Sequence, residues 1–313
     1  MRPDGPFHIK YRPLNFDEII GNRETILALK DKLRRPNCPH TFLFCGPSGT
    51  GKTTLARIVR KELVCGDMDF VELNAANTRG IDTIREIYNN SGYAPVSGRS
   101  RVYLIDECHQ ITSTAQEALL KITEDAPPHV YFILSTTNPE KLITTLRKRC
   151  EVYKLELLTR REITKLLIWV LIEENYPQED IDYFMDVIMQ IARLCDGCPR
   201  EALILLNQSI NLTKDEALEM LKKHVISGEA QVLQLCQQLL GPDDWATVAK
   251  TLINLDGDSE QLRRGVLTYM AKVLTSGKLD VKAIQIMRAF AVPTYDTGKN
   301  GLILAAAIVK SLS

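Results

Sequence analysis

Residues Cys45–Thr54 read Cys-Gly-Pro-Ser-Gly-Thr-Gly-Lys-Thr-Thr. An apolar run, Thr41–Phe44, precedes this stretch, and a segment with helical spacing of apolar residues, Leu55–Val59, follows it. The stretch fills the pattern G-x-x-x-x-G-K-[ST] in the strand–loop–helix context that the pattern requires. Its fixed positions are Gly46, Gly51, Lys52 and Thr53. The stretch therefore predicts a phosphate-binding loop rather than a chance glycine-rich turn.

Such a loop binds a nucleoside triphosphate. Its glycines let successive backbone N–H groups point at one anion, and the following helix N-terminus adds positive potential. Lys52 would reach the β- and γ-phosphates, and the Thr53 hydroxyl would hold Mg²⁺. The other loop residues expected to surround the phosphates are Gly46, Pro47, Ser48, Gly49, Thr50, Gly51 and Thr54. A dinucleotide fold is not predicted, because no third glycine completes its motif.

Composition places the chain among ordinary globular proteins. Its 313 residues suggest two or three domains, and 45% of them are hydrophobic and 25% charged. The 39 basic residues equal the 39 acidic ones, so any nucleic-acid contact must come from a local patch. No run of 18 apolar residues occurs, and the start Met1–Asp4 does not look like a signal peptide. We therefore expect no membrane partner and a cytoplasmic location.

The eight cysteines are scattered, and several lie inside apolar runs, as reduced buried thiols would. Cys195 and Cys198 form a single C-x-x-C without a second pair. A zinc site there is disfavoured, because two cysteines supply too few ligands.

A second motif follows the loop by about 55 residues. Arg101–Glu107 is a short apolar run that ends in two adjacent carboxylates. Continuous apolar strands are typical of a parallel sheet buried on both faces, and the carboxyl ends of its strands face the ligand crevice. Asp106 would hold Mg²⁺ through water, and Glu107 would act as general base on the attacking water. A strand that merely ends in a polar turn is the alternative for this stretch in isolation.

Four further segments are predicted as strands, which gives a five-stranded doubly wound sheet. They are His40–Cys45, Asp69–Asn74, Val130–Thr137 and Glu151–Leu155. Helices are expected over Thr25–Leu33, from the loop to about Val64, and over Ile81–Ile87. Ser113–Gln116 resembles a capping box that starts a helix to about Asp125, and Asn138 would cap another helix with Pro139 at its first position.

Strand patterns stop after Leu158. A capping box at Thr159–Glu162 opens helices at about 160–174, 180–195, 199–210 and 214–224, and Ile226–Gly228 is interpreted as a linker. Four or five more amphipathic helices are expected over residues 229–313. The last of them, Leu302–Ile308, is apolar nearly all round and should be buried within its domain or between subunits. The predicted domains are a nucleotide-binding domain (1–158), a helical lid (159–226) and a helical collar (227–313).

Taken together, these motifs resemble the AAA+ clamp-loader ATPases. The resemblance is carried by the phosphate-binding loop, the box Asp106–His109, the pair Arg149-Cys150 and the element Gly197–Leu203. The chain is similar both to the bacterial gamma/tau subunit and to the small subunits of replication factor C. The motifs cover about residues 8–210, and the remainder resembles the family only in helical character and length. The implied fold is an α/β P-loop ATPase with a helical lid and an all-helical C-terminal collar.

The resemblance implies an ATP site shared between subunits. Arg200 would be the sensor-2 residue of the same subunit, and Thr137, with Asn138 beside it, would occupy the sensor-1 position. Arg149 would be the arginine finger that reaches the neighbour's ATP, which makes a lone subunit a poor ATPase. The residues implied around adenine are Tyr11, Arg12, Pro13, Ile20 and Gly21. The residues implied in catalysis are Lys52, Glu107, Thr137, Asn138 and Arg149.

The resemblance also implies partners: a sliding clamp, primer-template DNA and other clamp-loader subunits in a pentamer. Arg79, Thr112, Ser113 and Gln116 match positions that track DNA phosphates in such assemblies. Two plainer interpretations stay open, since Arg79 could be an ordinary surface arginine and Ser113 is explained by helix capping.

The chain departs from the family pattern at several points. The four-cysteine zinc module of the bacterial subunit is missing, because Gly66–Asp69 follows Cys65 directly. Lys148 stands before Arg149, where the family usually has serine. We also expect no helicase-binding extension beyond the collar. This mixed character suits a phage or an unusual bacterial lineage.

The predicted function is ATP-driven loading of a sliding clamp in DNA replication. ATP binding would open the clamp and grip primed DNA, and hydrolysis would release both. One alternative is a helicase loader or branch-migration motor, but such motors usually add a winged-helix domain, and no strand pair is predicted after residue 160. Another is a non-hydrolysing stator subunit, which the presence of Lys52, Thr53, Asp106 and Glu107 disfavours.

Overall fold

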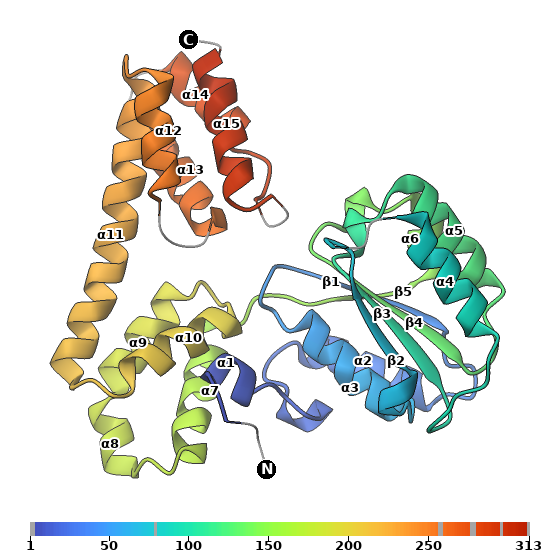
Figure 1. Ribbon diagram of the computed structural model, residues 1–313. Helices are drawn as coiled ribbons and strands as arrows, with labels where there is room; N and C mark the ends of the chain where they lie inside the picture. The colour runs from blue at the N-terminus through green and yellow to red at the C-terminus, as the bar shows by residue number, and fades with distance from the viewer. Residues whose placement is uncertain (1–3, 78–79, 256–258, 276–279, 295–296, 312–313) are drawn as a thin grey trace. The chain divides into compact units, whose positions relative to one another are not determined.

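The computed structural model of the chain describes residues 4–77, 80–255, 259–275, 280–294 and 297–311, without the side chains of 223–230. The chain divides into two compact units, Met1–Asn211 and Leu212–Ser313. Figure 1 shows a sheet with helices on both faces in the first unit and only helices in the second. Among the described residues, every helix is too short or too polar to cross a bilayer.

A parallel five-stranded sheet forms the centre of the first unit, as the sequence predicts. Its strands are β1 (Thr41–Cys45), β2 (Phe70–Asn74), β3 (Arg101–Asp106), β4 (Val130–Thr136) and β5 (Glu151–Lys154). They are arranged in the order β2-β3-β4-β1-β5, and every pair is parallel. β1 lies between β4 and β5, with Cys45 opposite Thr136 and Lys154. The phosphate-binding loop therefore leaves the sheet beside the ends of β4 and β5.

Alternate residues of the strands pack against two helical layers. Phe42 and Phe44 face a core shared with α2 (Arg23–Arg34) and α3 (Lys52–Glu62), whereas Leu43 faces the opposite core. That second core contains side chains of α4 (Ile81–Ser91), α5 (Ser113–Glu124) and α6 (Thr144–Arg149). Burial on both faces explains why these strands are continuous apolar runs.

The cap of α5 differs from the prediction. The N-cap residue is Thr112, whose hydroxyl accepts a hydrogen bond from the Ala115 N–H at 3.3 Å, so Ser113 is the first helical residue. Gln116 does not close a capping box. Its side chain is buried, donates to the carbonyls of Ile111 and Lys141, and accepts from the Ile143 N–H at 2.8 Å. The expected helix after Asn138 is only a 3₁₀ turn, Pro139–Lys141.

The helices predicted to form a lid follow the sheet within the same unit. They are α7 (Arg160–Glu173), α8 (Gln178–Tyr183), α9 (Met185–Leu194) and α10 (Pro199–Ser209). The capping box of Thr159 and Glu162 is confirmed. The helix expected over 180–195 is divided at Phe184 into α8 and α9. A short N-terminal helix, α1 (Phe7–Lys10), packs against α10, and a 3₁₀ turn covers Phe16–Glu18.

The second unit consists of helices, as predicted. The linker predicted at Ile226–Gly228 is wrong, because these residues are helical. A single helix, α11 (Lys214–Leu240), runs through Ile226–Gly228, so a domain boundary at 226 would fall inside it. The isolated Gly228 costs a helix only about 1 kcal/mol, and no proline interrupts the segment. The helices that follow are α12 (Trp245–Ile253), α13 (Ser259–Thr275), α14 (Val281–Ala289) and α15 (Lys299–Ser311). In α15, Leu302 is buried whereas Leu304 is 61% exposed, so the unit covers only one side of this helix.

A buried ion pair ties the parts of the second unit together. Glu260 on α13 accepts hydrogen bonds from Arg263 Nη2 at 2.6 Å and from the Thr294 N–H at 2.9 Å. Arg263 Nη1 also donates to the carbonyl of Phe290 at 2.7 Å. Burial by itself raises the pKa of Glu260, but the hydrogen bonds from Arg263 and Thr294 and the charges of Arg263 and Arg264 outweigh it, so the pKa lies below its ordinary value of 4.5.

We expect Glu260→Gln to destabilise the second unit by about 3 kcal/mol at neutral pH, because it leaves the buried Arg263 without its counterion. A depressed folded-state pKa contributes stability above the unfolded-state pKa and loses it as pH falls through the folded value. Urea unfolding of the full chain, followed by circular dichroism, should therefore show the gap between wild type and variant closing as the medium is acidified. The exposed Asp243→Asn change is the control. A gap that stayed constant with pH would contradict this assignment.

Candidate functional site

The phosphate-binding loop is shaped by close approaches that exclude a side chain. Gly46 has φ +149°, and a Cβ atom there would lie 2.2 Å from the carbonyl oxygen of Leu155. Gly49 has φ +74°, and its Cβ would lie 2.4 Å from the Cys198 sulfur. The first glycine lets the loop pass the end of β5, and the second lets the start of α10 approach the loop.

Lys52 begins α3 at the base of this loop. Its side chain is buried, and its ammonium donates to the carbonyls of Gly46 at 2.8 Å and Pro47 at 2.9 Å. Burial lowers the pKa of Lys52, while Glu107 and Asp106 raise it and Arg200 lowers it further. The loop thus folds around a cation that is already held among backbone oxygens.

The two side chains predicted to bind the metal lie next to each other. Thr53 Oγ1 donates to Asp106 Oδ2 at 2.8 Å, and the other Asp106 oxygen accepts from Ser135 Oγ and, at 3.0 Å, from the Glu107 N–H. A hydroxyl beside a carboxylate offers the oxygen ligands that Mg²⁺ prefers. Among the described residues, no cluster of three or more His, Cys, Asp or Glu side chains could bind a metal. The donor set therefore fits an ion that completes its shell with phosphate and water.

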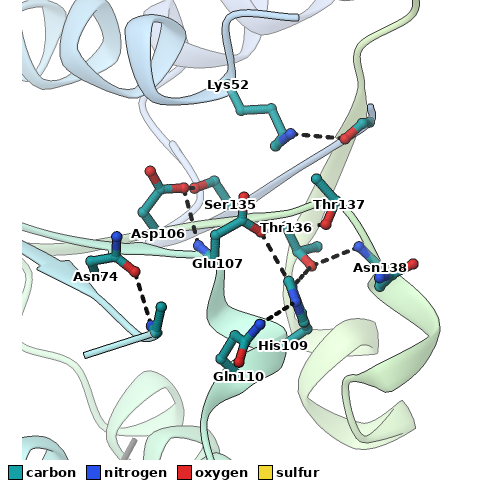
Figure 2. A network of polar contacts seen from close by, with 12 residues as sticks. Lys52, Asn74, Asp106, Glu107, His109, Gln110, Ser135, Thr136, Thr137 and Asn138 are labelled. Atoms are coloured by element: carbon teal, nitrogen blue, oxygen red, sulfur yellow. Dashed lines mark hydrogen bonds and ion pairs between the residues drawn. The ribbon is translucent and has the colours of Figure 1, made fainter. Parts of the chain in front are cut away.

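Glu107 lies one residue further on, where the end of β3 meets the end of β4 (Figure 2). It adopts φ +49°, a left-handed conformation that is uncommon for a residue with a side chain. Its carboxylate accepts from Thr137 Oγ1 at 3.4 Å and lies 3.4 Å from His109 Nδ1. Asn138 contacts the same network through its N–H, which donates to Thr136 Oγ1 at 3.0 Å. The predicted base and both sensor-1 residues are thus neighbours.

A pocket of about 110 Å³, partly open to solvent, lies between the phosphate-binding loop, the N-terminal arm and helices α7 and α10. The predicted residues that line it are Tyr11, Arg12, Pro13, Ile20, Gly49, Thr50, Gly51, Thr54 and Arg200. Gly21 lies between two lining residues and does not line the pocket itself. The residues not foreseen are His8, Glu18, Ile19, Asn22, Ile26, Leu55, Leu155, Leu158, Leu166, Trp169, Pro199 and Leu203.

The pocket wall suits a purine base. Leu155, Leu166 and Trp169 supply apolar and aromatic surface, and the Nδ1 atom of His8 is buried without a hydrogen-bond partner. Burial lowers the pKa of His8, and the charges of Arg200 and Arg12 lower it further, which favours the neutral ring. A neutral imidazole can pair with the edge of a base. In the sequence, the apolar residues at helical spacing in 160–174 could have indicated that Leu166 and Trp169 lie on the apolar face of one helix.

Other predicted residues lie away from this pocket. Arg149 ends α6 with 57% of its side chain exposed, and its guanidinium lies 2.7 Å from Glu124 Oε1. Thr112 and Ser113 are exposed at the start of α5, whereas Gln116 is buried and bonded to the backbone, so its predicted contact with DNA is not supported. Arg79 lies outside the described residues.

Comparisons with known proteins agree with this fold. The family profile of the DNA polymerase III delta subunit matches residues 67–159. The DNA polymerase III subunit gamma/tau of Mycobacterium bovis is 36% identical over 222 residues, which cover 64% of this chain and 38% of that protein. The tau subunit of Salmonella typhimurium is 29% identical over 95% of this chain and 47% of its own length. The chain thus spans less than half the length of these two relatives.

Solved structures of the Holliday junction branch migration motor RuvB of Thermotoga maritima share the fold. One of them aligns with a TM-score of 0.58 and 22% identity over 77% of this chain and 85% of RuvB. The predicted α/β fold is thereby confirmed, and at this low identity the likeness shows the fold alone. A shorter relative, the DNA polymerase III gamma subunit of Buchnera aphidicola subsp. Baizongia pistaciae, is 31% identical over 76% of this chain and 70% of its own length. This chain belongs to the family of DNA polymerase III gamma/tau subunits.

Proposed function

We propose that the protein is an ATP-hydrolysing subunit of a sliding-clamp loader in DNA replication. The observation that carries the proposal is the convergence of Lys52, Thr53, Asp106 and Glu107 where the phosphate-binding loop meets the ends of β3 and β4. Binding and cleavage of a triphosphate require groups of these kinds. Membership of the DNA polymerase III gamma/tau family supports a sliding clamp as the partner on which the ATPase acts.

Different residues of the chain would bind the base, the phosphates and the metal ion of ATP. The adenine base would occupy the apolar pocket between the N-terminal arm and the lid, with Arg200 directed at the phosphates from α10. Loop N–H groups and Lys52 would take the phosphate oxygens in place of the carbonyls that Lys52 now contacts. Thr53 and Asp106 would hold Mg²⁺, which neutralises charge on the phosphates when bound.

Hydrolysis needs a base and a counter-charge. Glu107 would accept the proton of the attacking water, and Thr137, 3.4 Å from its carboxylate, would orient that water or the γ-phosphate. Arg149 is absent from the lining of the chain's own pocket and is exposed, as a residue serving a neighbouring subunit should be. A finger in trans couples hydrolysis to assembly.

The remaining partners follow from the same proposal. The second unit would act as the collar of a pentamer, and the exposed hydroxyls of Thr112 and Ser113 at the N-terminus of α5 would contact phosphates of primer-template DNA. A helix N-terminus can bind phosphate without a large basic charge, which agrees with a net charge of zero.

The test is ATP hydrolysis by the full chain, alone and assembled with the other clamp-loader subunits, with and without clamp and primed DNA. We expect the lone chain to bind ATP and hydrolyse it slowly, and the assembly to respond to clamp and primed DNA together by about tenfold or more, because the finger must come from a neighbour. Stimulation by branched DNA junctions without a clamp would favour a branch-migration motor. Tight ATP binding without hydrolysis in the full assembly would favour a stator subunit.

A further inference from the structure

A buried histidine lies next to the predicted catalytic residues that follow strands β3 and β4. His109 belongs to the 3₁₀ turn Cys108–Gln110 that follows Glu107, and only 1% of its side chain is exposed. A polar ring at such a depth is costly unless it is hydrogen-bonded, so its partners indicate what it does. Those partners lie on the Glu107 side and on the β4 side of the site (Figure 2).

The contacts of the ring define its tautomer. The Nε2 atom of His109 lies 3.3 Å from the amide nitrogen of Gln110, which can only donate, so Nε2 accepts. The proton is therefore on Nδ1, which lies 2.8 Å from Thr136 Oγ1 and 3.4 Å from Glu107 Oε2. One N–H thus donates to the end of β4 and also faces the carboxylate of the predicted base.

Thr136 extends this link to the sensor loop. Its Oγ1 atom accepts from the Asn138 N–H at 3.0 Å as well as from His109. Thr137, between them, donates to Glu107 at 3.4 Å. The His109 ring and the Thr137 hydroxyl therefore both contact Oε2 of the Glu107 carboxylate.

The backbone at Glu107 requires such support. A left-handed residue with a side chain costs about 1–2 kcal/mol and persists where surrounding contacts fix it. The Glu107 carbonyl accepts from the Gln110 N–H at 2.9 Å, so the turn that carries His109 also fixes the conformation of Glu107.

We propose that His109 is a positioning residue for ATP hydrolysis: its Nδ1–H, shared between Thr136 and Glu107, holds the base in register with the sensor-1 loop. This inference rests on the proposed function, because it assigns Glu107 as the base. It predicts that the base and Thr137 move together when nucleotide binds, since one ring joins the two segments that carry them.

The test compares two amide substitutions in the full assembly. The side-chain amide of asparagine lies near the place of Nδ1, whereas that of glutamine lies near Nε2. We expect His109→Asn to keep kcat within about threefold of wild type and His109→Gln to lower kcat by tenfold to about a hundredfold, because a base misplaced by about 1 Å loses a rate factor of that order. The ATP Kd, measured with a slowly hydrolysed analogue, should be unchanged in both.

Four results would overturn the inference, the last of them together with the proposed function. Equal losses of kcat in both variants, accompanied by lower thermal stability, would show that the ring only fills space. A His109→Gln enzyme as fast as wild type would show that the ring is not needed. A further loss when His109→Gln is added to Glu107→Gln would show that it does not act through Glu107, since residues acting as a unit are non-additive. Wild-type assembly that binds but never hydrolyses ATP would refute the proposed function itself, and this inference with it.

Discussion

Replacing Arg149 with alanine should lower the clamp- and DNA-stimulated ATPase rate of the assembly by about 10³-fold or more, while the ATP Kd stays nearly unchanged. The planar guanidinium suits the charge that develops on the equatorial oxygens of the transferred phosphoryl group, and fingers of this kind supply rate factors of about 10³–10⁵. Arg149 does not line the pocket of its own chain, so its loss should spare nucleotide binding there. Single-turnover hydrolysis and equilibrium binding of a fluorescent nucleotide separate the two quantities.

Two neighbours provide matched controls. Glu124→Gln removes the exposed ion pair with Arg149, which should change stability by less than about 1 kcal/mol and leave the finger in place. Lys148→Ala removes an adjacent positive charge, at the position where the family usually has serine, and should have a far smaller effect. An Arg149→Ala protein that loses most of its ATP affinity, or an equal rate loss in the isolated chain, would contradict a role in the neighbouring site.

The sequence was most informative where one physical constraint acted along a continuous stretch. The sheet is buried on both faces, so β1, β3 and β4 are unbroken apolar runs, and their ends were located to within about a residue. The phosphate-binding loop is equally local, because its glycines serve the backbone of the loop itself. For the same reason Thr53 and Asp106 could be paired in advance: parallel strands bring their carboxyl ends to one edge.

The sequence was least informative where a residue's partner is distant along the chain. Gln116 fits a capping box, yet its amide binds the backbone before α6, about 27 positions away. In the sequence, Trp169 is indistinguishable from any core aromatic on α7, and only the structure shows that it lines the same pocket as Tyr11 and Arg200. His109 follows the two carboxylates in sequence, but its role depends on Thr136, which only strand pairing brings within 2.8 Å.

Replacing Lys52 with alanine should weaken ATP binding by about 100-fold or more and thereby abolish hydrolysis in the assembly. The Lys52 ammonium is a buried cation that the fold already holds among the carbonyls of the phosphate-binding loop. A charge-assisted contact to phosphate in a site of low dielectric contributes on the order of 2–3 kcal/mol, which corresponds to roughly that factor in affinity. Isothermal titration of the full chain with ATP measures it directly, without need of partners.

The control lies on the same helix. Lys61 is exposed near the end of α3, where its ammonium donates to the Leu14 carbonyl at 3.3 Å, so Lys61→Ala removes an equal charge from α3 without touching the phosphate-binding loop. It should leave the ATP Kd within about twofold of wild type, as expected for a surface substitution. Because alanine is a good helix former, both variants should keep the fold, which circular dichroism can verify. If Lys52→Ala bound ATP as tightly as Lys61→Ala, Cys45–Thr54 would not be the triphosphate site, and the roles assigned to Thr53, Asp106 and Glu107 would fail with it.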